Sequence, residues 1–156
     1  MSEFYDNPES LGPRVCENVE EGLSLLSDLA QLKKKESENS LLIVINGMPN
    51  SGKTFLGAAF RDKNAKAINL PDPERLEDNH YKEMIKGFDY VTVTDTGERF
   101  VIDRKLQRIL GRKSDLFAYM YNPNTEQLFS SYAKGADIII KNSQAEVKNS
   151  QSYARH

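Results

Sequence analysis

The clearest chemistry in this chain of 156 residues lies in one short glycine-rich run. The run fits the pattern G-x-x-x-x-G-K-[ST] without a gap and reads Gly47-Met48-Pro49-Asn50-Ser51-Gly52-Lys53-Thr54. Gly47 and Gly52 let the backbone approach a ligand more closely than a Cβ atom would allow, so successive N–H groups can surround phosphate oxygens. Lys53 then reaches the β- and γ-phosphates of a nucleotide, and the Thr54 hydroxyl can bind Mg²⁺. The residues expected to contact the nucleotide are Gly47, Asn50, Ser51, Gly52, Lys53 and Thr54.

A magnesium ion at such a loop also needs a carboxylate at the end of a neighbouring strand. Asp95 directly follows the run Tyr90–Thr94 and is the first candidate for this ligand. An alternative stays open, because residues 91–94 and 99–102 can also pair as a β-hairpin with Asp95 in its turn. Asp103 would then be the metal ligand. Neither aspartate is followed by a glutamate, the usual water-activating residue of hydrolytic ATPases.

A second carboxylate, that of Asp72, follows the weak apolar run 65–70. At the end of a strand it could accept the proton of an incoming hydroxyl group. The alternative is that Pro71, Asp72 and Pro73 form only a turn in which the aspartate is a local cap.

Basic residues cluster between the third and fourth expected strands, and they are Arg99, Arg104, Lys105, Arg108, Arg112 and Lys113. Arg104, Arg108 and Arg112 recur at four-residue steps, so they line one face of a helix. Phosphoryl transfer needs cations that neutralise developing charge, and we predict that Arg108 supplies one. The alternative is an ordinary solvated face of charged residues.

Alternating strands and helices must position these residues. The apolar run Leu41–Ile45 is typical of a strand buried on both faces of a parallel sheet. Further strands are expected at 65–70, 90–94, 116–121 and 137–140, and helices at 15–35, 53–62, 74–86, 105–112 and 125–134. This order predicts an α/β protein: a three-layer, Rossmann-like fold whose mostly parallel five-stranded sheet carries helices on both faces. We expect a lead-in over 1–14, one domain over 15–142 and a flexible tail over 143–156.

Length and composition fit one domain and exclude several classes of protein. The chain is 38% hydrophobic and 28% charged, which describes a polar but foldable sequence. No apolar run approaches the ~18 residues of a membrane span, and the first residues lack the order of a secretory signal. One cysteine, Cys16, excludes an internal disulfide and a cysteine-built zinc site. We therefore expect a cytoplasmic protein with no membrane contact. The net charge of −2 does not indicate a large basic surface, although a local basic patch is possible.

The chain resembles the P-loop kinases of nucleosides, nucleotides and small metabolites. The resemblance rests on the N-terminal helix, on residues 41–54 and on a closing run that reads Gly135-Ala136-Asp137-Ile138-Ile139-Ile140-Lys141-Asn142. Uridine-kinase-like and dephospho-CoA-kinase-like members commonly close with an Ala-Asp pair, aliphatic residues and an asparagine. The resemblance implies a P-loop NTPase fold, ATP with Mg²⁺ as cofactors, and transfer of the γ-phosphoryl group to a small acceptor. It also implies that Asp72 is the base.

One departure from the kinase pattern keeps other functions open. The arginine-rich lid of those kinases would correspond to residues 122–134, which contain no arginine. The first alternative is a motor-type or regulatory ATPase that acts on nucleic acid or a protein partner, because residues 116–123 resemble the polar sensor strand of such proteins. The second is an inactive nucleotide binder or a GTPase, although the chain lacks the N/T-K-x-D element that reads guanine.

Overall fold

A computed structural model describes residues 13–70 and 80–143 of the chain. Within these ranges one parallel sheet of six strands has the order β1-β6-β5-β2-β4-β3. The strands are β1 (Arg14–Cys16), β2 (Leu41–Gly47), β3 (Ala67–Leu70), β4 (Tyr90–Asp95), β5 (Leu116–Tyr121) and β6 (Ile138–Lys141). The α-helices are α2 (Val19–Lys35), α3 (Lys53–Lys63), α4 (His80–Met84), α5 (Arg99–Leu110) and α6 (Ser130–Ala133), and a 3₁₀ turn, η3 (Ile85–Gly87), follows α4.

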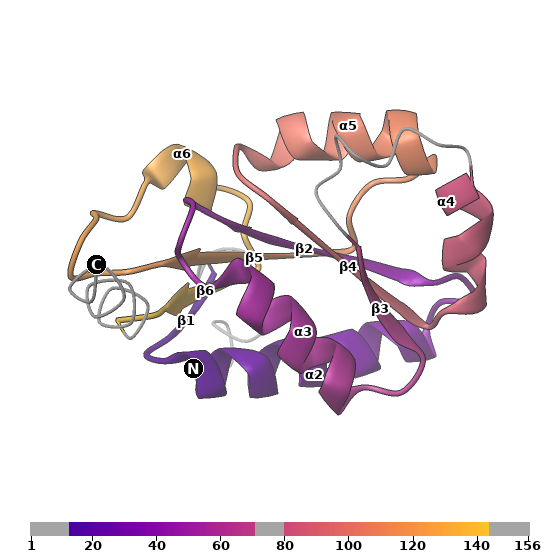
Figure 1. The fold of residues 1–156 in the computed structure, drawn as a ribbon, viewed down its shortest axis with the longest axis horizontal. Helices are drawn as coiled ribbons and strands as arrows, with labels where there is room; N and C mark the ends of the chain where they lie inside the picture. The colour runs from indigo at the N-terminus through magenta and orange to yellow at the C-terminus, as the bar shows by residue number, and fades with distance from the viewer. Residues whose placement is uncertain (1–12, 71–79, 144–156) are drawn as a thin grey trace, which may run out of the picture.

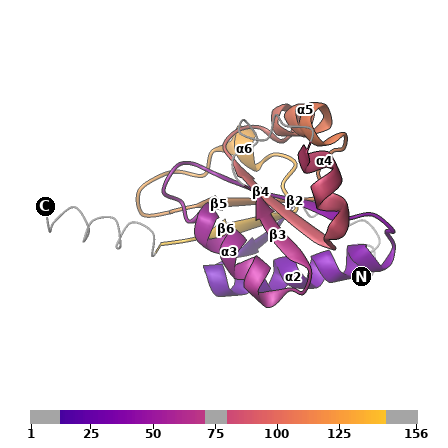
Figure 2. The ribbon, with the colours of Figure 1, turned by 45° about the vertical axis from the view of Figure 1, so that its right-hand side comes forward.

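Helices cover both faces of the sheet and give the three layers that the sequence predicts. Figure 1 shows α4, α5 and α6 above the strands and α2 and α3 below them, and the turned view in Figure 2 keeps this separation. On one face Leu26 of α2 and Phe60 of α3 pack on the strands, and on the other Ile102 and Leu106 of α5 do so. The fold is therefore a Rossmann-like α/β fold.

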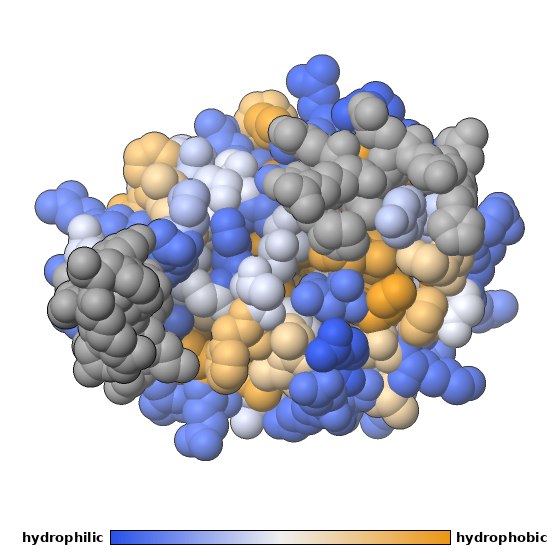
Figure 3. Space-filling model, in the orientation of Figure 1, coloured by the Kyte–Doolittle hydropathy of each residue, from blue (hydrophilic) through white to orange (hydrophobic). Residues whose placement is uncertain are grey.

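The strand β2 is buried along its whole length because it lies inside the sheet, between β4 and β5. This burial explains why the run Leu41–Ile45 is apolar on both faces. Figure 3 shows the hydrophilic side chains gathered along much of the outline of the molecule. Among the described residues, no helix has both the length and the apolar character needed to cross a membrane.

The sixth strand corrects the expectation of five. β1 pairs with β6 at the edge of the sheet, with Val15 opposite Ile139. The helix expected over 15–35 accordingly begins later, at Val19, because the Asn18 side chain caps it by accepting the N–H of Glu21 at 2.8 Å. A three-residue strand with one exposed valine has too little periodicity to be distinguished from the first turn of the helix.

The hairpin alternative for residues 91–102 is wrong in this structure. Residues 99–102 form the first turn of α5, and β4 ends at Asp95 beside β2. Asp103 therefore lies on α5, where it accepts the N–H of Ser114 at 2.9 Å. The helix expected over 105–112 begins six residues earlier, at Arg99, and the one expected over 125–134 covers only Ser130–Ala133.

Candidate functional site

The glycine-rich loop connects β2 to α3 at the carboxyl end of the sheet, as the sequence predicts. Its backbone is left-handed at Asn50, with φ of 67°, and at Gly52, with φ of 102°. Asparagine and glycine adopt this conformation more readily than other residues. Ser51 between them is buried, whereas Met48 is exposed, so the chain turns outward after β2 and back into α3.

Close packing explains the two glycines of the motif. A Cβ atom on Gly47 would lie 2.5 Å from Ser51 Oγ and 2.6 Å from the backbone oxygen of Met120. A Cβ atom on Gly52 would clash with the side-chain amide nitrogen of Asn142. That amide donates a hydrogen bond to the Ser51 carbonyl at 2.9 Å. Asn142, which follows β6, is therefore packed directly against the loop.

The start of α3 has the features of an anion site. Gly52 offers no side-chain cap, and the first turn of the helix carries no acidic residue. The first N–H groups of a helix have no partner within it and attract negative charge. The Ser51 hydroxyl is buried and has no hydrogen-bond partner among the described atoms. These donors fit a phosphate group, and the exposed Thr54 lies in the same turn.

Lys53 lies against the loop itself. Its Nζ atom donates to the Gly47 carbonyl at 2.7 Å and to Thr96 Oγ1 at 2.8 Å. The Thr96 hydroxyl donates in turn to the Gly47 carbonyl at 2.6 Å. The sequence did not indicate this role for Thr96, because the contact depends on the residue after β4 reaching the loop after β2.

Asp95 ends β4 directly beside the strand that carries the loop, since its register partner is Asn46 of β2. Only 8% of the residue is exposed. Its Oδ1 atom accepts the N–H of Thr96 at 2.8 Å, and its Oδ2 atom lies 3.2 Å from Lys105 Nζ. The sequence placed Lys105 in the basic cluster without a specific role.

The donor set at this edge fits magnesium bound together with phosphate. Among the described residues, no three His, Cys, Asp or Glu side chains gather into a metal cluster. Magnesium in nucleotide sites usually takes one or two protein oxygens, with phosphates and water as its other ligands. Thr54 and Asp95 supply a hydroxyl and a carboxylate of this kind.

The buried Asn46 side chain connects the loop strand to the start of α5. Its Oδ1 atom accepts the N–H of Gly97 at 3.0 Å, and its Nδ2 atom donates to the Gly97 carbonyl at 2.8 Å. This pair of bonds fixes the turn that carries Asp95 and Thr96 beside the loop.

The structure does not bring the arginine face to the loop. Arg108 is exposed in the last turn of α5, and this helix runs away from the edge at which β4 ends. Arg112 lies beyond its end and pairs with Asp115 at 2.6 Å. Asp115 also accepts the N–H of Leu42, close to the start of β2. The Arg112–Asp115 pair therefore lies at the amino end of the strands, at the opposite edge of the sheet from the loop, which lies at their carboxyl end.

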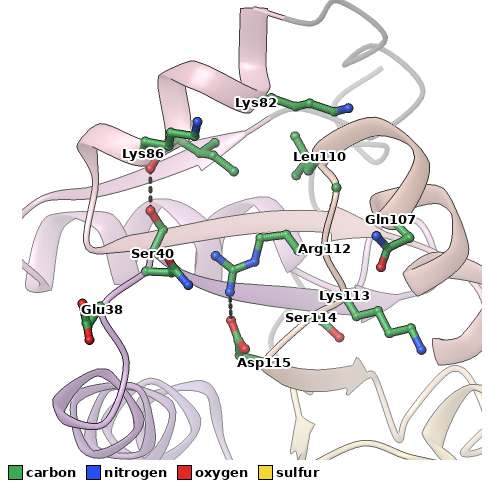
Figure 4. Close-up of a pocket in the computed structure, with 13 residues that line it drawn as sticks. Glu38, Ser40, Lys82, Lys86, Gln107, Leu110, Arg112, Lys113, Ser114 and Asp115 are labelled. Carbon is green, nitrogen blue, oxygen red and sulfur yellow. Dashed lines mark hydrogen bonds and ion pairs between the residues drawn. The ribbon is translucent and has the colours of Figure 1, made fainter.

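A cavity of about 800 Å³ lies at that opposite edge and is lined in part by Arg112 and Lys113. Figure 4 shows Lys82 and Lys113 on opposite sides of this cavity, with the Arg112 guanidinium turned toward Asp115. The cations here do not converge on one point, so the cavity does not take the place of the loop as a phosphate site. Asp72 lies outside the described residues, and its role as a base stays a prediction.

No family model matches the chain, and no curated protein matches its sequence. Among solved structures the chain is similar to that of a possible uridine kinase from Bacillus stearothermophilus, with 14% sequence identity and a TM-score of 0.44. The match covers 74% of this chain and 98% of that one. A likeness of this degree carries no conclusion about the site.

The fold and the glycine-rich loop together fit one broad class of protein. A parallel sheet whose inner strand runs through a G-x-x-x-x-G-K-T loop into a helix fits the P-loop nucleotide-binding proteins.

Proposed function

We propose that this chain binds ATP with Mg²⁺ and transfers the γ-phosphoryl group to the hydroxyl of a small acceptor, such as a nucleoside, a nucleotide or another metabolite. One observation carries the nucleotide part of this proposal. Just before α3 the glycine-rich loop holds the buried Ser51 hydroxyl, which has no hydrogen-bond partner among the described atoms, and the Lys53 ammonium lies against the same loop. This arrangement suits the charge and the shape of a triphosphate.

Each residue of the loop has a defined task in this proposal. Backbone N–H groups of the loop and of the first turn of α3 bind phosphate oxygens, and Lys53 exchanges its bond to the Gly47 carbonyl for one to the β- and γ-phosphates. Thr54 and Asp95 would hold the magnesium ion, which supplies positive charge to the phosphates when it is bound.

Transfer is favoured over hydrolysis by the identity of the residue after Asp95. That residue is Thr96, and its hydroxyl is already bonded to Lys53 and to the Gly47 carbonyl. A threonine engaged in this way is a poor base for activating water. A hydroxyl acceptor with its own base fits the site better, and we propose Asp72 as that base.

A panel of acceptors tests the proposed reaction. ADP release from ATP should be slow with the protein alone and should rise with one member of a panel of nucleosides, nucleotides and metabolites. Asp72→Asn should retain ATP binding and lose this stimulated release, because only the base is removed. Full activity of that variant would exclude Asp72 as the base.

The same assay separates the alternative functions. Stimulation by DNA, RNA or a protein, and not by small molecules, would favour a motor-type or regulatory ATPase. Binding of ATP without turnover in any arm would favour an inactive nucleotide binder, and preference for GTP over ATP would favour a GTPase.

A further inference from the structure

A cation already lies at the carboxylate that we assign to magnesium. Lys105 Nζ is 3.2 Å from Asp95 Oδ2, and the two side chains are 25% and 7% exposed. This pair is better shielded from water than an ordinary surface ion pair, so its Coulomb attraction is stronger. Any divalent ion that binds Asp95 must compete with this ammonium group.

The Lys105–Asp95 pair belongs to the same network as the loop lysine. Lys53 Nζ donates to Thr96 Oγ1 at 2.8 Å, and the Thr96 N–H donates to Asp95 Oδ1 at 2.8 Å. The two ammonium groups are thus linked through two adjacent residues. The bonds between Asn46 and Gly97 hold the turn after β4 against β2. The helix α5, which follows this turn, thereby holds Lys105 close to the glycine-rich loop.

We propose that Lys105 is a second resident cation of the nucleotide site, which neutralises Asp95 and thereby lowers the Mg²⁺ dependence of nucleotide binding. This inference rests on the proposed function, because it concerns the same phosphate site. Lys105 also supplies positive charge from α5, whereas residues 122–134 contain no arginine.

The physical reason is a balance of charge at the end of β4. A bare carboxylate beside the loop would repel phosphate oxygens, and Mg²⁺ would be needed to reverse that repulsion. Lys105 cancels the negative charge in advance, so a nucleotide can bind without the metal. Loss of the ammonium should weaken binding without metal and should free Asp95 for Mg²⁺.

Calorimetric titration with ADP, in Mg²⁺ and in EDTA, tests this inference. The ratio of the two affinities should be at least about fivefold larger in Lys105→Gln than in the unmodified protein, the factor that corresponds to a pair worth about 1 kcal/mol. Lys113→Gln is the matched control, since Lys113 is exposed at the opposite edge of the sheet, and its ratio should be unchanged. Lys105→Arg keeps the charge and should also keep the ratio.

Electron paramagnetic resonance of Mn²⁺ gives a second readout that needs no turnover. Mn²⁺ should bind more tightly to the ADP complex of Lys105→Gln than to that of the unmodified protein. If Lys105→Gln does not fold, Lys105→Met, which retains the apolar stem of the side chain, takes its place in both measurements. Equal affinity ratios in the variant and the unmodified protein would overturn the role of Lys105 alone. Failure of the unmodified protein to bind ADP would overturn this inference and the proposed function together.

Discussion

At the scale of single residues, the loop is built by the packing of small groups. The environment of Gly47 is crowded by a backbone oxygen of β5, which cannot move out of the way as a flexible side chain could. This contact makes Gly47 a structural requirement of the loop as well as a part of the proposed phosphate site.

Gly47→Ala should therefore lower the free energy of unfolding by about 1–3 kcal/mol, as overpacking of a tight site usually does. Gly87→Ala is the control, because a Cβ atom there would meet no atom within 4 Å. That variant should keep the stability or raise it by up to about 1 kcal/mol. Urea unfolding of both variants gives the comparison, and equal stabilities would contradict this close packing of the loop.

The sequence predicted the loop residues because their identity and spacing are local properties. Thr96 and Lys105 escaped prediction as site residues for the opposite reason. Their contacts with Lys53 and Asp95 depend on where β4 ends and α5 begins, and on the pairing of β4 with β2. A linear sequence with a possible hairpin over 91–102 does not fix those boundaries.

At the scale of elements, α5 is held to the sheet by its first residue. The Arg99 guanidinium donates a hydrogen bond to the Gly135 carbonyl and packs over the ring of Phe117. It also forms two ion pairs, with the carboxylate of Asp137 at 3.4 Å and with that of Asp103 at 3.6 Å. Its guanidinium thus joins the start of the helix to the beginnings of β5 and β6.

Replacement of this arginine should be costly. Arg99→Met should lower the free energy of unfolding by about 2–3 kcal/mol, because it leaves partly buried carboxylates without their cation. Arg104→Met on the exposed face of the same helix should change it by less than about 0.5 kcal/mol. Thermal or urea unfolding measures the difference, and similar losses in both variants would remove Arg99 from this role.

The elements themselves were predicted unevenly, for physical reasons. Long apolar runs such as Leu41–Ile45 predicted their strands, because full burial on both faces leaves no polar position. The start of α5 was obscured, because Phe100 and Val101 are hydrophobic but 60% and 41% exposed. These two exposed hydrophobic residues obscure the helical periodicity of Ile102 and Leu106, whose side chains face the sheet.

At the scale of the whole molecule, the order of the strands brings the parts of the candidate site together. β2 lies between β4 and β5, so the ends of three strands bring Asp95, the loop and the Met120 carbonyl together. The sequence predicts a parallel sheet from the alternation of strands and helices, but it does not give this order, which depends on which helices cover which face.

A buried thiol and two buried tyrosine hydroxyls, on three different strands, should make the fold less stable at alkaline pH. Burial raises the pKa of the Cys16 thiol above its ordinary 9.0, and it raises the pKa of the Tyr90 and Tyr119 hydroxyls above their ordinary 10.0. These groups lose their protons more readily in the unfolded chain. Their contribution to stability is thus complete below about pH 9 and is lost as the pH rises toward the raised values.

The urea midpoint should accordingly stay level from about pH 7 to 8.5 and fall between about pH 9 and 11. Tyr119→Phe should show a shallower fall, since a phenylalanine has no proton to lose there. A midpoint that stays constant up to about pH 11 would contradict the effect of burial on these groups.

Equilibrium binding of ATP, measured by calorimetry, tests the central claim most directly: the loop between β2 and α3 binds the phosphates of a nucleotide. Lys63→Ala, at the exposed end of α3, should bind ATP as the unmodified protein does. Lys53→Ala should bind it at least about tenfold more weakly, because a charge-assisted bond to phosphate is lost. Equal affinity of the two variants, or absence of ATP binding by the unmodified protein, would contradict the claim.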